Sequence, residues 1–179
     1  MEIAQWRIIR NIDRRFILQV TDEEFRTFFI YCLLEILEFL PNVIEALKIF
    51  KNKFKHIIVV TNQQGVGKGI MKIEDVEEVH RFMIQQVEDN DAKIDKVYFC
   101  PQLKSVPDNY RKPSPKMAYF AQSDFPDIDL SKSIMIGDMN SDVEFGRNAG
   151  MKTIFVGDNE LKITPDDRFE TLYDFAKTL

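Results

Sequence analysis

Residues 57–69 read IIVVTNQQGVGKG, and this stretch decides the fold class. Its four apolar residues are followed at once by polar residues and glycines, which is typical of a short buried strand that ends in a turn. Three later apolar runs have the same form and cover residues 96–99, 134–136 and 153–156. Helical patterns separate the runs, over residues 43–50, 73–88, 115–123 and 142–149. This alternation predicts an α/β fold with a doubly wound, mainly parallel sheet.

The chain has 179 residues and a net charge of −5. Its length suits a single domain over residues 1–179 and is too short for two ordinary domains. The basic residues are scattered, so no stripe of Lys and Arg indicates a nucleic acid partner or an anionic membrane. The two cysteines, Cys32 and Cys100, are far apart, which disfavours a disulfide framework and a zinc site. We expect a protein of the reducing cytoplasm.

The most apolar stretch covers residues 28–40. Glu35 and Glu38 interrupt it, and it is shorter than the roughly 20 residues that a membrane-spanning helix needs. Residues 1–7 lack the apolar region and the cleavage site of a secretory signal. We therefore expect a buried or capping segment at 28–40 and no membrane association.

Thr61 stands directly after the predicted strand at 57–60, at the sheet edge where parallel α/β folds bind ligands. A hydroxyl and backbone amides at a strand tip, with glycines at 65, 67 and 69, suit the binding of a phosphate. An ordinary glycine-rich turn explains the same residues equally well when the segment is taken alone. The segment is not a P-loop, because Ile70 stands where Ser or Thr should complete that motif.

Residues 110–113 read YRKP and place two cations before a proline. Pro113 restricts the backbone before it, so Lys112 can be held as a fixed positive charge beside an anion. A solvated basic pair is the alternative, and it is the commoner meaning of an isolated Arg-Lys pair.

Two carboxylates, Asp138 and Asp142, follow the predicted strand at 134–136. Like charges crowded at one turn are costly without a cation, and hard oxygen ligands favour Mg²⁺. Ser141 or Asp142 is also a plausible N-cap for the next helix, and this role is compatible with the first.

Taken together, these segments resemble the haloacid dehalogenase (HAD) superfamily, and within it the branch containing histidinol-phosphate phosphatase and D,D-heptose 1,7-bisphosphate 7-phosphatase. The matching sequence motifs are, in chain order, Val-Thr-Asn-Gln-x-Gly-Val-Gly-Lys-Gly, Cys-Pro, Arg-Lys-Pro and Ile-Gly-Asp-x-x-x-Asp. The resemblance covers about residues 39–156. It implies a HAD-like, Rossmann-type three-layer sandwich with a minimal cap.

The resemblance further implies a Mg²⁺-dependent phosphomonoesterase that acts on a small phosphorylated metabolite, first of all a sugar phosphate such as a heptose bisphosphate. An aspartate at the end of the first strand would attack phosphorus to form an aspartyl-phosphate, and an acid two residues later would protonate the leaving oxygen. Five matched residues would bind substrate: Thr61, Asn62, Gln63, Arg111 and Lys112. Lys112 would also neutralise the nucleophile and the transferred phosphate, and Asp138 would coordinate Mg²⁺ with Asp142 nearby.

The superfamily's first motif, Asp-x-Asp-Gly, is missing from this chain. We place the N-terminal strand at residues 16–20, because this apolar run directly precedes an acidic segment. That register predicts Asp22 as the nucleophile and a metal ligand, and Glu24 as the acid.

Two other registers remain open. A register one residue earlier puts Thr21 and Glu23 in these positions, and a threonine hydroxyl is a weak nucleophile without an adjacent base. A third register uses Asp13 and replaces the acid with Arg15. The alternative function is therefore a catalytically impaired HAD-like protein that binds phosphate or serves in assembly after losing its nucleophile.

Relatives often carry Cys-x-His and then Cys-x-Cys before Arg-Lys-Pro. Here only Cys100 is kept, and residues 108–110 replace the second pair. One thiol cannot form a tetrahedral site, so we expect no structural zinc and a small buried role for Cys100. We also expect an open site and a monomer or weak homodimer.

Overall fold

The computed structural model describes residues 2–4 and 39–179. The predicted strand at 16–20 lies outside the described residues, as does most of the apolar stretch at 28–40. Six candidate residues also lie outside them: Asp13, Arg15, Thr21, Asp22, Glu23 and Glu24.

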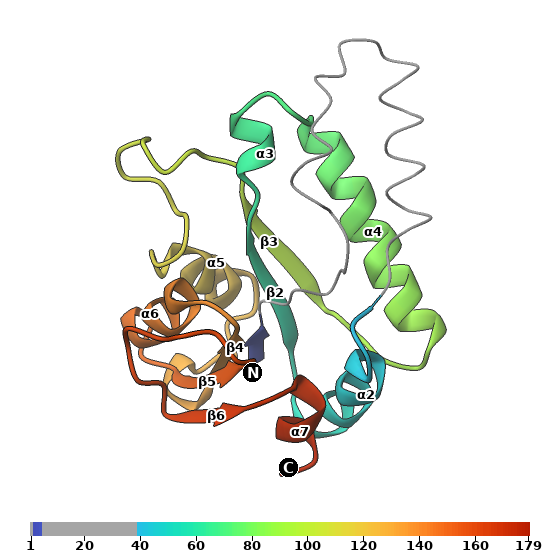
Figure 1. The fold of residues 1–179 in the computed structure, drawn as a ribbon. Coiled ribbons are helices and arrows are strands. Elements are labelled where there is room, and N and C mark those ends of the chain that lie inside the picture. Colours follow the sequence, from blue (N-terminus) through green and yellow to red (C-terminus); the bar gives the residue numbers. More distant parts are fainter. Residues whose placement is uncertain (1, 5–38) are drawn as a thin grey trace.

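The described strands form one parallel sheet in the order β3-β2-β1-β4-β5-β6 (Figure 1). In chain order they are β1 (Glu2–Ala4), β2 (Ile57–Asn62), β3 (Lys96–Cys100), β4 (Ile134–Gly137), β5 (Lys152–Val156) and β6 (Asp167–Phe169). The chain runs outward from β1 in both directions, so the doubly wound α/β fold predicted from the sequence is confirmed. Each of the four predicted apolar runs is a strand.

The N-terminal strand begins earlier in the chain than the sequence indicates. β1 lies between β2 and β4, where Ile3 pairs with Ile58 on one side and Met135 on the other. Its three residues, one of them charged, form no apolar run that a sequence pattern detects. The central place in the sheet thus belongs to Glu2–Ala4.

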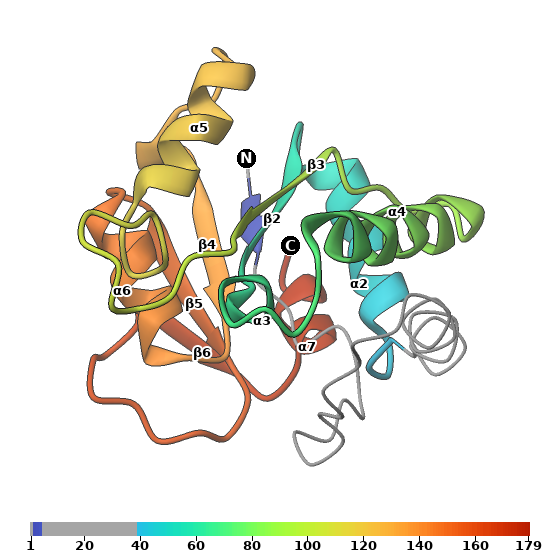
Figure 2. The same cartoon turned by 90° about the horizontal axis from the view of Figure 1, so that it is seen from above.

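Helices cover both faces of the sheet (Figure 2). They are α2 (Val43–Lys53), α3 (Gln64–Gly67), α4 (Ile73–Asp89), α5 (Lys116–Asp124), α6 (Asn140–Asn148) and α7 (Leu172–Ala176), with a 3₁₀ turn at Leu130–Lys132. The four predicted helices are confirmed with small shifts at their ends. The other two, α3 and α7, are too short to give a helical period in the sequence.

β2 shows how the alternation of side chains builds two cores. Ile57 and Val59 pack into a cluster with residues of α2, α4 and α7, whereas Ile58 and Val60 pack with residues of α5 and α6. All four side chains are buried, as expected for a strand covered on both faces. The two cores fix β2 in the middle of the fold and hold its tip in place.

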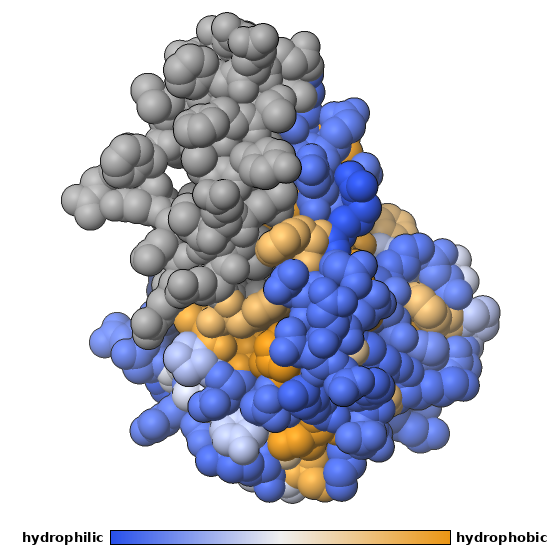
Figure 3. Space-filling view, turned by 90° about the vertical axis from the view of Figure 1, so that its right-hand side faces the viewer, coloured by the Kyte–Doolittle hydropathy of each residue, from blue (hydrophilic) through white to orange (hydrophobic). Residues whose placement is uncertain are grey.

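The surface seen in Figure 3 is mainly hydrophilic where it is described, with small separate hydrophobic patches. Among the described helices, none has both the length and the apolar character of a membrane-spanning segment.

Candidate functional site

The tips of β2 and β4 end at the same edge of the sheet. Ala4 of β1 pairs with Val59 on one side and with Ile136 on the other, which sets the two outer strands in register. Thr61 lies two positions after Val59, and Asp138 lies two positions after Ile136. Strand pairing therefore brings these residues, 77 positions apart in the chain, to opposite sides of the central strand's end.

Lys112 reaches this edge from the loop between β3 and α5. It is 2 % exposed, and its Nζ lies 3.0 Å from Asp142 Oδ1 and donates a 2.8 Å hydrogen bond to the Val60 carbonyl. A solvated basic pair is thus the wrong reading for Lys112. The side chain is a buried cation held beside the tip of β2.

Asn62 holds the backbone of Lys112 in place. The Lys112 N–H donates to Asn62 Oδ1 at 2.9 Å, and Asn62 Nδ2 donates to the Lys112 carbonyl at 3.3 Å. No local pattern signals this reciprocal pair, because the two residues are 50 positions apart. The side chain of Asn62 therefore positions Lys112, a function that the sequence interpretation did not foresee.

Burial and ion pairing shift the pKa values of Lys112 and Asp142 in opposite directions. Burial lowers the pKa of Lys112 to about 8, against the opposing attraction of Asp142. Burial also raises the pKa of Asp142, against the attraction of Lys112. The negative charge of Asp138, at the same turn, opposes the lowering of the Lys112 pKa and adds to the raising of the Asp142 pKa. The attraction of Asp142 favours the charged form of Lys112.

Asp142 also organises the turn after β4. The helix α6 has Met139 as its N-cap, so the prediction of Ser141 or Asp142 as N-cap is wrong. Asp142 instead lies in the first turn, where its Oδ2 accepts a 3.0 Å hydrogen bond from the Met139 N–H. A Cβ on Gly137 would lie 2.4 Å from the Cβ of Asp142, so only glycine fits before Asp138.

Asp138 differs from Asp142 in its surroundings. It is partly buried, and among the described residues its carboxylate takes part in no hydrogen bond or ion pair. Mg²⁺ is commonly held by one or two carboxylates together with water and phosphate oxygens. A free carboxylate beside an already neutralised one fits that cation, and Asp138 is the residue that would hold it.

Gln63 and Arg111 flank the strand tip. Gln63 Nε2 lies 3.4 Å from Thr61 Oγ1, and the Gln63 N–H donates to the Cys100 carbonyl at 2.8 Å. The Nη1 of Arg111 is buried and has no hydrogen-bond partner in the part of the chain that the structure describes. Buried guanidinium donors are normally paired, so this nitrogen has an unused donor for an anionic ligand.

Local steric and backbone constraints explain why glycine stands at two positions after Thr61. A Cβ on Gly67 would lie 2.6 Å from the Pro101 carbonyl oxygen, and Gly69 has a φ of +69°. These constraints belong to the turn and its contact with the next loop. The ordinary glycine-rich turn therefore accounts for these two residues. The hydroxyl oxygen of Thr61 accepts from Gln63, and among the described residues no acceptor takes its O–H, which is left for a ligand.

The loop before Arg111 is closed by polar side chains. Gln102 Oε1 accepts from the Tyr110 N–H at 3.3 Å and lies 3.8 Å from the Cys100 sulfur. Cys100 is buried, as predicted, and burial raises the pKa of its thiol. Gln102 thus links the two ends of this loop.

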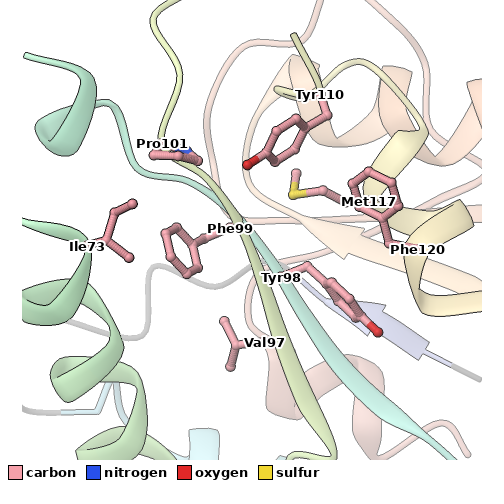
Figure 4. Close-up of a pocket in the computed structure, with 8 residues that line it drawn as sticks. All are labelled: Ile73, Val97, Tyr98, Phe99, Pro101, Tyr110, Met117 and Phe120. Atoms are coloured by element: carbon pink, nitrogen blue, oxygen red, sulfur yellow. The ribbon is translucent and has the colours of Figure 1, made fainter. Parts of the chain in front are cut away.

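An apolar cavity of about 290 Å³ lies at the sheet edge formed by β3 (Figure 4). Phe99 and Tyr98 point to opposite sides of that strand, and Ile73 and Phe120 line the cavity from the neighbouring helices. Thr61, Lys112 and Asp138 are not among the lining residues. The cavity is therefore separate from the polar site.

The carboxyl edge of this parallel sheet carries the Thr61 hydroxyl, the buried Lys112–Asp142 pair and the free carboxylate of Asp138. These groups on this fold define the class of the protein as a hydrolase that acts on phosphate groups. Residues 109–173 match a family model described as HAD-hydrolase-like.

Curated relatives agree with this class. The chain is 34 % identical over 148 residues to the D-glycero-D-manno-heptose-1,7-bisphosphate 7-phosphatase of Chlorobaculum tepidum, covering 72 % of this chain and 74 % of the relative. It is 30 % identical over 152 residues to the D-glycero-alpha-D-manno-heptose-1,7-bisphosphate 7-phosphatase of Campylobacter jejuni, covering 85 % and 78 %. The chain therefore belongs to the haloacid dehalogenase superfamily, in the branch of the heptose bisphosphate phosphatases.

A solved structure shares the fold. The D,D-heptose 1,7-bisphosphate phosphatase of B. bronchiseptica, complexed with magnesium and phosphate, superimposes with a TM-score of 0.76 at 18 % identity. The match covers 99 % of this chain and 96 % of that one. The predicted resemblance and the predicted HAD-like architecture are thus confirmed.

Proposed function

We propose that this protein is a Mg²⁺-dependent phosphomonoesterase acting on a sugar phosphate, with a heptose bisphosphate as the first substrate to test. The observation that carries the proposal is the buried Lys112–Asp142 pair at the tip of β2, beside Thr61 and the free carboxylate of Asp138. The names of the relatives support the substrate class.

Thr61 and Lys112 would bind the transferred phosphoryl group. The ammonium of Lys112 has three N–H donors. One bonds the Val60 carbonyl, and the other contact of the ammonium among the described residues is its ion pair with Asp142, so donor capacity is left for a phosphate oxygen. Fixed donors in a site shielded from water stabilise the negative charge of the transition state, which is the main requirement of phosphoryl transfer.

Three further residues would complete the substrate site: Asn62, Gln63 and Arg111. Asn62 acts through its hold on Lys112, and Gln63 lies beside the Thr61 hydroxyl. The unpaired Nη1 of Arg111 is available for a second anionic group of the substrate.

Asp138 would hold Mg²⁺, which when bound neutralises charge on the phosphoryl oxygens. Asp22 is the proposed nucleophile and second metal ligand, and Glu24 is the proposed acid. In that reaction a carboxylate oxygen of Asp22 bonds to phosphorus while the ester bond breaks, and Glu24 gives its proton to the leaving oxygen. Glu24 then takes a proton from the water that attacks phosphorus, which releases phosphate and regenerates the Asp22 carboxylate. Lys112 balances the charge that gathers on the transferred group.

One observation favours a second candidate function, a phosphate-binding protein without group transfer. The central strand is Glu2–Ala4, and residues 5–12, which follow it in the sequence, contain no carboxylate. The next acidic residue along the chain is Asp13. A protein of this kind would keep Thr61, Lys112 and Asp138 and would bind its ligand unchanged.

Phosphate release decides between the two functions. We would incubate the purified protein and Mg²⁺ with D-glycero-D-manno-heptose 1,7-bisphosphate and with a generic phosphomonoester such as p-nitrophenyl phosphate. We expect release that EDTA removes, that Asp138→Ala abolishes, and that the surface control Asp124→Ala retains. Absence of release across a broad phosphate panel, with phosphate binding preserved, would establish the second function instead.

The same experiment can locate the nucleophile. Asp22→Asn should abolish release whereas Asp13→Asn should keep it, and the reverse result would assign the nucleophile to Asp13. We further propose a cytoplasmic location, which fits a sequence whose two cysteines are far apart, and a monomer or weak homodimer, which size-exclusion chromatography with light scattering would test.

A further inference from the structure

The segment between β5 and β6, residues 157–166, lies against the turn that carries Asp138. Asn159 Nδ2 donates a 3.1 Å hydrogen bond to the main-chain carbonyl of Asp138. The Lys162 N–H donates a 2.7 Å hydrogen bond to the side chain of Asn140, at the start of α6. The segment therefore contacts the turn on both sides of Met139.

The peptide unit between Asp138 and Met139 is held by two side chains from different parts of the chain. Asn159 binds its carbonyl, and Asp142 Oδ2 accepts from its N–H at 3.0 Å. The other oxygen of Asp142 pairs with Lys112. One peptide unit thus links the exposed segment to the buried ion pair.

Arg168 of β6 fixes Asn159 in turn. Its Nη2 donates to the carbonyls of Gly157 and Asn159 at 3.1 and 3.3 Å, and its guanidinium lies 5.0 Å from the ring centroid of Phe155. Arg147 binds the carbonyl of Thr164 further along the segment. The backbone on both sides of Asn159 is therefore anchored to the body of the sheet.

We infer that Asn159 is a positioning residue for Asp138: its hydrogen bond fixes the 138–139 peptide and so aims the Asp138 carboxylate at the cation. The carbonyl carbon of this peptide is bonded to the Cα that carries the Asp138 side chain, so holding the peptide at both its C=O and its N–H fixes the main chain from which the carboxylate projects. Partners that orient a ligand in this way control metal affinity without touching the metal. Arg168 supports the same contact indirectly, through its hydrogen bonds to the carbonyls of Gly157 and Asn159. The inference rests on the proposed function in one respect, namely that Asp138 binds a divalent cation.

The affinity for Mn²⁺ measures the effect of Asn159 on the metal site without any turnover. It is obtained from the electron paramagnetic resonance signal of the free ion during a titration. Asn159→Ala removes one neutral hydrogen bond and should weaken Mn²⁺ binding by ~3- to 10-fold. Arg168→Ala should weaken it in the same direction by a smaller factor. Asn52→Ala is the matched control, because Asn52 is also an exposed asparagine that donates to a main-chain carbonyl, that of Lys48, but it does so on α2. It should leave Mn²⁺ affinity unchanged.

A kinetic readout separates positioning from a loss of structure. For Asn159→Ala the Mg²⁺ concentration at half-maximal rate should rise by the same factor, while the rate at saturating Mg²⁺ is retained and thermal unfolding matches that of Asn52→Ala. If the unaltered protein binds Mn²⁺ and Asn159→Ala binds it equally well, the inference is overturned and the proposed function stands. If the unaltered protein binds no Mn²⁺, or Asp138→Ala binds it unchanged, the metal site of the proposed function fails and the inference fails with it.

Discussion

Replacing Lys112 with methionine tests how much the buried ion pair contributes to the fold and to the site. The Lys112 and Asp142 side chains are 0 % and 1 % exposed, and their charged atoms are 3.0 Å apart. Removal of the cation leaves a buried carboxylate without compensation, which costs about 3–5 kcal/mol. For a chain of this size that corresponds to a fall of ~6–20 °C in Tm. Since burial raises the pKa of Asp142, the variant should recover part of this loss in acid, where the carboxylate becomes neutral.

Thermal and urea unfolding at pH 7.5, followed by circular dichroism, measure the loss. Lys96→Met is the matched control, because Lys96 forms a 2.6 Å ion pair with Asp124 but its side chain is 46 % exposed, and the change should cost less than about 1 kcal/mol. The double variant Lys112→Met/Asp142→Asn should be more stable than the sum of the two single changes predicts, by at least ~2 kcal/mol. A loss below about 1 kcal/mol for Lys112→Met, or strict additivity in the double variant, would refute the reasoning.

Three further changes test separate parts of the structure. Gly137→Ala places a Cβ 2.4 Å from that of Asp142, and we expect a loss of ~1–3 kcal/mol in urea unfolding; an unchanged midpoint would show that the turn can relax. Burial lowers the pKa of His80 from 6.5 to about 4, so the unfolded state binds more protons between these values and stability should fall as the pH drops through this window. His80→Phe should lose less stability than the unaltered protein over the same window, and equal losses would contradict this account. Gln102→Ala removes the acceptor of the Tyr110 N–H in the loop before Arg111; it should raise KM for the sugar phosphate ~3-fold with little change in kcat, and an effect on kcat alone would contradict a role in substrate binding.

Much of the fold follows from short local patterns. Ile57 to Val60 are buried on both faces of the sheet, so a continuous apolar run marks them without ambiguity. The helix at 140–148 has Ala149 as its C-cap and is followed by Gly150, whose φ of +75° is the left-handed geometry expected just after a helix. Residues with such strong local preferences were predicted correctly.

The missed elements are short or depend on distant partners. β1 and β6 have three residues each, so neither gives a periodic signal, and pairing with neighbouring strands decides their structure. Asn62 and Lys112 meet across 50 positions of sequence, and Asn159 meets the carbonyl of Asp138 through a loop. Contacts of this kind become visible only when the strands are placed side by side. The sequence therefore identified Thr61, Lys112 and Asp138 as candidates but could not show what holds them.

A crystal structure of the protein with Mg²⁺ and orthophosphate tests the central claim most directly, namely that the tips of β2 and β4 form one site for phosphate and metal. We predict phosphate oxygens within hydrogen-bond distance of Thr61 Oγ1 and Lys112 Nζ, with the metal ion on the carboxylate of Asp138. The same electron density would show which of Asp13, Thr21 or Asp22 faces the phosphate. Phosphate and metal bound away from these strand tips, at concentrations that saturate binding in solution, would contradict the account.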